Sequence, residues 1–99
     1  MRARPPFIAF ASAKAGLRAI AQGMAREFGP AGLHVAHVII DGGIDGERLR
    51  TVLPDFVAGK GEDGTLDIDA IADTYWHLHT QHRSAWTHEL DLRPFKEPF

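Results

Sequence analysis

Several features are missing from these 99 residues, and each absence excludes a class of protein. There is no cysteine, so disulfide bonds and thiolate chemistry are excluded. No apolar run approaches the roughly 20 residues of a membrane-spanning helix, and the basic residues 1–6 precede no signal-peptide core. The formal charge of −2 does not suggest the basic stripe of a nucleic-acid-binding protein. We therefore expect a cytoplasmic chain with neither a membrane nor a nucleic acid partner.

A glycine-rich phosphate-binding turn is also absent. Dinucleotide-binding domains begin with a strand, a turn with spaced glycines and a helix whose N-terminus receives the pyrophosphate. The segment 41–43 follows an apolar run, but it precedes no long helix and lacks that glycine spacing. The hydrophobic content of 44% is ordinary for a globular protein. The length allows one domain, which we assign to residues 1–99.

The apolar pattern predicts a long first helix that begins at about residue 10 and ends at Phe28. Residues 1–7 are expected to be extended, because Pro5 and Pro6 cannot lie inside a helix. The pair Gly29 and Pro30 is expected to end the helix. One apolar stripe with helical spacing contains Leu17, Ile20, Ala21, Met24 and Phe28.

Four further elements follow from periodicity and from the positions of proline and glycine. They are a strand over 34–40, a short helix over 46–53 that stops at Pro54, a helix over 68–81 capped by Asp67, and a strand over 86–92. A polar loop is expected over 58–64. In the last strand, alternation points Trp86, His88, Leu90 and Leu92 inward. A strand, a helix and a second strand predict a right-handed crossover between parallel strands, hence an α/β fold.

The segment 10–17 resembles the active-site helix of the short-chain dehydrogenase/reductase family. In that family a Tyr lies four residues before a Lys, so the two side chains share one face of the helix. Here the lysine is Lys14, and the tyrosine position holds Phe10. A phenyl ring cannot give or take a proton. The position that holds the catalytic Tyr in the resembled family is therefore occupied here by a residue that cannot act as an acid or a base.

The resemblance continues over most of the chain, from about Phe7 to Arg93. The family's cofactor-facing turn reads Pro-Gly-x-Ile-x-Thr, and the corresponding positions here are Asp41, Gly42, Ile44 and Gly46. The family's catalytic Ser would fall before Met1. The resemblance therefore implies the C-terminal portion of a doubly wound, Rossmann-like parallel sheet, with two strands and about three helices.

What the resemblance implies for function is NAD(P)-dependent hydride transfer between a carbonyl and an alcohol. Lys14 would bind the ribose of NAD or NADP, and Asp41, Gly42 and Ile44 would lie beside the nicotinamide carboxamide. We expect no turnover from the isolated chain, which could also bind no cofactor. None of the neighbouring polar residues replaces the tyrosine: Ser12 points elsewhere, His37 lies in mid-strand, and Asp45 has no visible partner.

Two other functions stay open. One is a non-catalytic interaction module, a homo-oligomer assembled through the first helix or the last strand, because two strands alone do not cover their own faces. An aromatic cluster towards the C-terminus would suit such an interface: Tyr75, Trp76, Trp86, Phe95 and Phe99. The other is a small metal site among His77, His79, His82 and His88, although we expect no physiological metal because no acidic or sulfur ligand stands in register.

Overall fold

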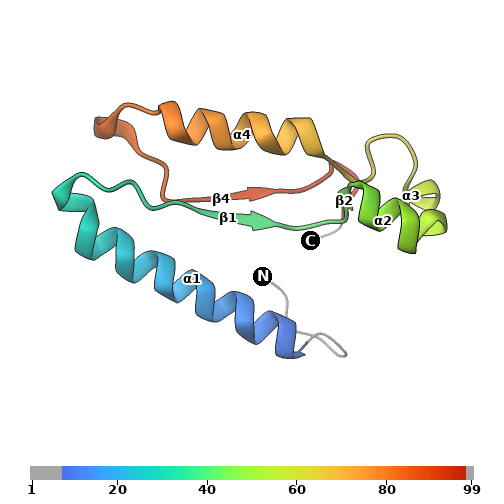
Figure 1. Cartoon of the computed structure of the whole chain (residues 1–99), viewed down its shortest axis with the longest axis horizontal. Helices are drawn as coiled ribbons and strands as arrows, with labels where there is room; N and C mark the ends of the chain where they lie inside the picture. The colour runs from blue at the N-terminus through green and yellow to red at the C-terminus, as the bar shows by residue number, and fades with distance from the viewer. Residues whose placement is uncertain (1–7, 98–99) are drawn as a thin grey trace. The chain divides into compact units, whose positions relative to one another are not determined.

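The computed structural model describes residues 8–97, which form two compact units. The first unit contains residues up to Ile39 and the segment 81–90, and the second contains residues 40–80 and those from Asp91 onward. The elements, in chain order (Figure 1), are α1 (Ile8–Phe28), η1 (Gly29–Ala31), β1 (His37–Ile40), β2 (Ile44–Asp45), α2 (Glu47–Val52), α3 (Pro54–Lys60), β3 (Leu66–Asp67), α4 (Ile68–Thr80), η2 (Arg83–Ala85) and β4 (Glu89–Leu92).

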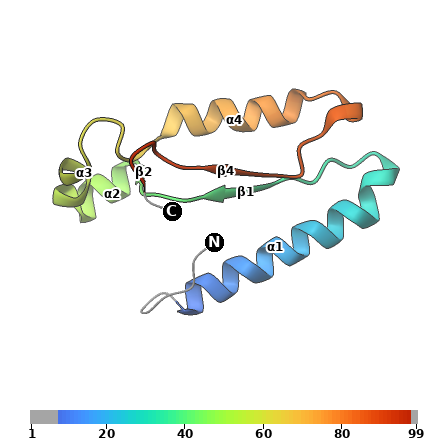
Figure 2. The same ribbon diagram turned by 180° about the vertical axis from the view of Figure 1, so that it is seen from behind.

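The strands form two small parallel pairs. β1 pairs with β4, and both faces of the ribbon drawing show the two strands side by side (Figures 1 and 2). The amide of His37 donates to the carbonyl of His88 over 2.7 Å, and that of Asp41 donates to Leu92 over 2.9 Å. From His37 to Asp41 the first strand advances four residues, and its acceptors advance four residues in the same direction, from His88 to Leu92. The two strands are therefore parallel and the pairing contains no bulge. β2 pairs with β3 in parallel register, with Ile44 opposite Leu66.

The α/β class expected from the sequence is confirmed, and the element list grows. The pair β2 and β3 was not expected, because two-residue strands leave no periodic signal. Pro54 does not simply stop a helix: it begins α3, where its fixed φ and missing N–H suit a first-turn position. The loop expected over 58–64 is therefore helical up to Lys60. The assignment of residues 1–99 to one domain stays a prediction.

The first helix ends differently from the expectation. Gly29 and Pro30 do not terminate the helical path but continue it as the 3₁₀ turn η1. The left-handed residue that ends it is Gly32, with φ 96°, and its amide donates to the carbonyl of Gly29 over 2.8 Å. Pro30 is the second residue of η1, where its missing backbone N–H would have had no partner within the turn.

α1 buries small side chains and leaves its large ones exposed. Ala11 and Ala21 are buried, whereas Leu17 and Ile20 are exposed by 50% and 60%. The apolar stripe expected to face the core is thus largely uncovered in the described residues.

The last helix begins as expected and packs through a narrower face. Asp67 accepts a hydrogen bond from the amide of Ala70 over 2.9 Å, which confirms it as the N-cap of α4. Leu78 is the buried residue of the helix, while Ile68 and Tyr75 are about half exposed. The apolar face that helical spacing places at Ile68, Ile71, Tyr75 and Leu78 is therefore only partly covered.

The expected alternation in the last strand holds at Asp91 and fails at Thr87 and Glu89. Regular pairing covers only Glu89–Leu92, and Asp91 is its one exposed residue. Thr87 and Glu89, expected to face outward, are half-buried because each has a polar partner, Gln81 and Arg18 respectively. A polar side chain that has a hydrogen-bonding partner can be half-buried, so the alternation of apolar and polar residues does not predict its burial here.

Two expectations concern the ends of the chain and the membrane. The extended segment 1–7 and the aromatic Phe99 lie outside the described residues. Within 8–97, no helix has the length and apolarity to cross a membrane.

Gly42 occupies a position that no other residue fits without strain. Its φ is +152°, and a Cβ there would lie 2.7 Å from Cδ of Pro94. Gly23, by contrast, lies in α1 with nothing within 4 Å of such an atom. The two glycines therefore differ in both backbone conformation and space.

We expect Gly42→Ala to lower the free energy of unfolding by about 1–3 kcal/mol, from backbone strain and the proline clash. The matched control Gly23→Ala should raise it by about 0.5–1 kcal/mol, because alanine favours an exposed helix interior. Urea unfolding followed by circular dichroism measures both. A neutral Gly42→Ala would contradict the described turn.

Candidate functional site

The structure brings Phe10 and Lys14 together on α1. The Lys14 ammonium lies 5.4 Å from the centre of the Phe10 ring, within range of a cation–π interaction. Both residues are exposed, Phe10 by 62%. The position one turn before the lysine therefore presents a phenyl face to the ammonium and offers no hydroxyl that the ammonium could acidify.

The turn expected to face a cofactor lies in the second unit, whereas Lys14 belongs to the first. Asp41 is half-buried, and its backbone amide is tied to Leu92 of β4. Gly42 lies against Pro94, and Ile44 begins β2. The turn is thus anchored by the last strand on one side and by β3, opposite Ile44, on the other.

Gly43 also has a packing role in this turn. A Cβ at Gly43 would lie 2.9 Å from Cε1 of Phe56 and 3.1 Å from Cδ2 of Leu49. The absence of a side chain lets α2 and α3 approach the backbone of the turn. The turn is therefore in contact with β3, β4, α2 and α3. The glycine pair in its sequence did not predict these contacts.

Asp45 does have a partner, contrary to the expectation from sequence. Its carboxylate accepts hydrogen bonds from both Nε and Nη2 of Arg50, the second over 2.8 Å. The hydrogen bonds from Arg50 lower the pKa of Asp45 below its ordinary value, and the same pair raises the pKa of Arg50. The spacing of five residues across the start of α2 gave no helical signal for this pair, because Asp45 lies in β2.

In the first unit a charged group joins α1 to both strands of the sheet. Arg18 Nε lies 2.8 Å from Oε1 of Glu89, and Arg18 Nη2 donates to Oε2 over 3.1 Å. The buried His37 directs Nδ1 to within 3.7 Å of the same Oε1, without a hydrogen bond. Glu89 thus connects the exposed side of α1 with the interior of β1.

Two histidines extend the contact between the segments that precede β1 and β4. Nε2 of His34 donates to the carbonyl of Thr87 over 2.8 Å, and Nδ1 of His88 donates to that of Val35 over 3.2 Å. The His34 ring also stacks on Trp86, with centroids 4.6 Å apart and an interplanar angle of 3°. Imidazoles here take the place of backbone pairing, which explains why the regular strands are shorter than expected.

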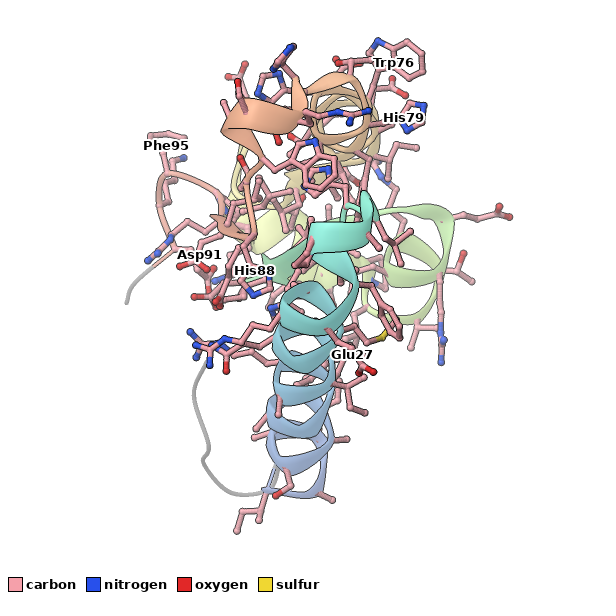
Figure 3. The ribbon with its side chains drawn as sticks, turned by 90° about the vertical axis from the view of Figure 1, so that its left-hand side faces the viewer. Glu27, Trp76, His79, His88, Asp91 and Phe95 are labelled. Carbon is pink, nitrogen blue, oxygen red and sulfur yellow. The ribbon has the colours of Figure 1, made fainter. Side chains whose placement is uncertain are left out.

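The histidines do not assemble a metal site. No group of three or more His, Asp or Glu side chains in residues 8–97 is arranged to hold an ion. His79 and His82 do not share a helix, because α4 ends at Thr80 and His82 caps η2 by accepting a hydrogen bond from the amide of Ser84. His79 instead lies against the 67%-exposed Trp76, as Figure 3 shows.

The remaining aromatic residues do not form one buried group. Trp86 is half-buried against His34, whereas Tyr75 and Trp76 are exposed on α4. Phe95 is exposed by 79% and projects from the segment after β4 (Figure 3). Their part in an interface stays a prediction.

Comparison with known proteins gives one clear likeness. The chain is similar to the crystal structure of a short-chain dehydrogenase from Rhodopseudomonas palustris, with 43% sequence identity and a TM-score of 0.61. The likeness covers 96% of this chain but 34% of the dehydrogenase, so the chain spans about a third of that protein's length. No protein-family model matches the sequence, and no curated protein matches it. The fold is thus α/β and similar to one part of that dehydrogenase.

The Asp45–Arg50 pair predicts a pH effect with a definite sign. A carboxylate whose pKa is lowered on folding stabilises the fold above its unfolded pKa, and this contribution is lost as the pH falls through the lowered value. We expect Arg50→Ala to return the pKa of Asp45 upward to its ordinary range. Carboxyl chemical shifts followed through an acid titration measure it, with Arg48→Ala as the control. An unchanged Asp45 titration in Arg50→Ala would show that the pair does not form.

Proposed function

We propose that this chain supplies the C-terminal part of an NAD(P)-dependent oxidoreductase fold of the short-chain dehydrogenase type, whose reaction is hydride transfer between a carbonyl and an alcohol. The observation that carries the proposal is the 43% identity to a short-chain dehydrogenase over 96% of the chain. The pairing of Lys14 with the ring of Phe10 on one face of α1 supports it, because this spacing is that of the resembled active site.

The residues present suit one end of a dinucleotide. The exposed Lys14 ammonium can donate hydrogen bonds to ribose hydroxyls, and the backbone at Gly42 and Ile44 can approach a planar carboxamide closely. The described residues contain no glycine-rich turn at a long helix that would receive the pyrophosphate. When bound, the nicotinamide would supply the hydride.

Phe10 limits the proton-transfer step of the proposed reaction. Reduction of a carbonyl needs a proton delivered to the developing alkoxide, and a positioned acid is typically worth about 10²–10⁴-fold in rate. The phenyl ring at this position delivers none, and water is the remaining donor. We therefore propose that the chain alone gives no detectable turnover.

A chimera tests the proposal directly. This chain would replace the matching third of the Rhodopseudomonas palustris dehydrogenase, and dinucleotide binding and carbonyl reduction would be measured over a panel of carbonyl compounds. We expect the chimera to bind the dinucleotide with turnover reduced about 10²–10⁴-fold, and Phe10→Tyr to recover most of that loss. Lys14→Ala should weaken dinucleotide binding, whereas Arg26→Ala, distant on α1, should not.

Two results would contradict the proposal. A folded chimera that binds no dinucleotide would show that this chain does not carry the cofactor contacts. Equal turnover by the chimera with and without the Phe10→Tyr substitution would show that this position is not that of the acid.

The exposed large side chains of α1 favour a second candidate, a non-catalytic module that self-assembles. Exposures of 50% for Leu17 and 60% for Ile20 leave an apolar surface of the kind found at interfaces. Light scattering of the isolated chain at micromolar concentration distinguishes the two. A discrete oligomer that Leu17→Glu dissociates would support the module, whereas the oxidoreductase fragment predicts a monomer without a sharp unfolding transition.

A further inference from the structure

Three aspartates of this chain are followed directly by glycine: Asp41, Asp45 and Asp63. In an aspartyl-glycine sequence the side-chain carboxyl can react with the next backbone nitrogen, because glycine has no Cβ to shield that nitrogen. The product is a succinimide ring, which water opens to aspartate or to isoaspartate. The three dipeptides are chemically identical and all lie in the second unit, so the structure around each one decides which of them reacts.

Asp45 is held in an unreactive form. Nε and Nη2 of Arg50 both donate to its carboxylate, the second over 2.8 Å. These hydrogen bonds lower the pKa of Asp45 and keep its carboxyl ionised at neutral pH. Ring closure expels a carboxyl oxygen as water, which requires the protonated acid, and the side chain must first leave Arg50. The amide of Gly46 is also occupied, because it donates to the carbonyl of Ile44 over 2.8 Å.

Asp41 is restrained by the packing of its turn. Its side chain is half-buried, and its amide donates to the carbonyl of Leu92 over 2.9 Å. Gly42, which carries the nitrogen that would attack, lies so close to Pro94 that a Cβ there would be 2.7 Å from Cδ of the proline. Ring closure moves this nitrogen towards the aspartate side chain, and the turn leaves little room for the movement.

Asp63 lies in a different environment, in the turn between α3 and β3. It is exposed, and within residues 8–97 its carboxylate has no hydrogen-bond or ion-pair partner. Its φ of 54° is in the left-handed region, where it is the one described residue other than glycine. Gly64 is buried, and its amide donates to the carbonyl of Gly61 over 3.2 Å. A single turn-closing hydrogen bond therefore has to open before the Gly64 nitrogen can react.

We propose that Asp63 is a site of spontaneous covalent modification, at which the chain converts aspartate to isoaspartate. The Gly64 nitrogen attacks Cγ of Asp63 and forms a new N–C bond, and one carboxyl oxygen leaves as water with the carboxyl proton and the amide proton. Water then adds to the backbone carbonyl carbon of Asp63, and the bond from that carbon to the Gly64 nitrogen breaks, with a proton returning to the nitrogen. Nothing is oxidised or reduced, and mass and charge are unchanged.

The modification changes the turn that leads into β3. The backbone now passes through Cγ of Asp63, so it is longer by one methylene group and has one more rotatable bond, while the α-carboxylate becomes a side group. Gly64 fits tightly below the end of α3, where a Cβ would clash with the carbonyl of Lys60. We therefore expect the longer backbone to displace Gly64 and to loosen the last turn of α3.

Incubation of the full chain at neutral pH in water labelled with heavy oxygen measures the reaction. Each ring opening introduces one heavy oxygen, which mass spectrometry of the digested chain locates, and isoaspartate resists a protease that cleaves before aspartate. We expect isoaspartate at Asp63 to form at least about tenfold faster than at Asp45, the factor to which hydrogen bonds to a charged partner correspond. The excess over Asp41 should be roughly two- to tenfold.

Two controls separate the effect of structure from that of sequence. In urea, where the fold is lost, the three sites should react at similar rates. In the folded chain, Arg50→Ala should raise the rate at Asp45 about tenfold and leave the rate at Asp63 unchanged, because only Asp45 loses a partner. The matched variant Arg48→Ala should change neither rate.

A peptide in which Asp63→Glu forms no isoaspartate completes the test, because the longer side chain would have to close a six-membered ring. Isoaspartate that forms first at Asp41 or Asp45, or at equal rates at all three sites in the absence of urea, would overturn the proposal. So would an unmodified Asp63 in a chain whose urea-unfolded form does react there. None of these readouts depends on dinucleotide binding or turnover, so the proposal stands or fails separately from the proposed function.

Discussion

The small amount of apolar surface that this chain buries limits everything else in its structure. Ala11, Ala21 and Leu78 are its buried apolar residues over 8–97, and no large side chain there is fully enclosed. Burial of apolar surface is the main favourable term in folding, and short chains have the least of it to set against conformational entropy. A 21-residue helix that buries alanines therefore depends on other contacts for its position.

Those other contacts are directional and polar. Arg18 and Glu89 connect α1 to the sheet, and His34 and His88 bond to backbone carbonyls of the opposite segment. A typical hydrogen bond contributes about 0.5–1.5 kcal/mol net, so a handful fixes geometry more effectively than it supplies stability. The first unit accordingly has a well-specified arrangement of side chains and a weak core. Such a segment gains most when a larger apolar partner is added.

The candidate site shows a related division of roles. Lys14 and Phe10 lie one helical turn apart on α1, with the ammonium over a phenyl ring that has no proton to exchange. The turn from Asp41 to Ile44 is held firmly by Pro94, Leu66 and the α2–α3 segment, so its backbone is specified whether or not a ligand is bound. The packing that holds this turn therefore involves other side chains than Phe10 and Lys14.

The sequence by itself determined the α/β class, the approximate bounds of α1 and α4, the Asp67 cap and the juxtaposition of Phe10 with Lys14. Each of these depends on residues close together in the chain, through helical period, capping or proline geometry. It did not determine the β2–β3 pair, the bonds of Asp45 to Arg50, or the choice of the alanine face of α1 for burial. Those features depend on which segment, distant in the sequence, packs next to a residue. A hydrophobic pattern indicates that an apolar stripe is to be buried, but it does not specify which element buries it. Only the tertiary structure decided that the large side chains of α1 stay outside, because Ala11 and Ala21 are the residues that it buries and Arg18 is the residue that bonds to Glu89 of β4.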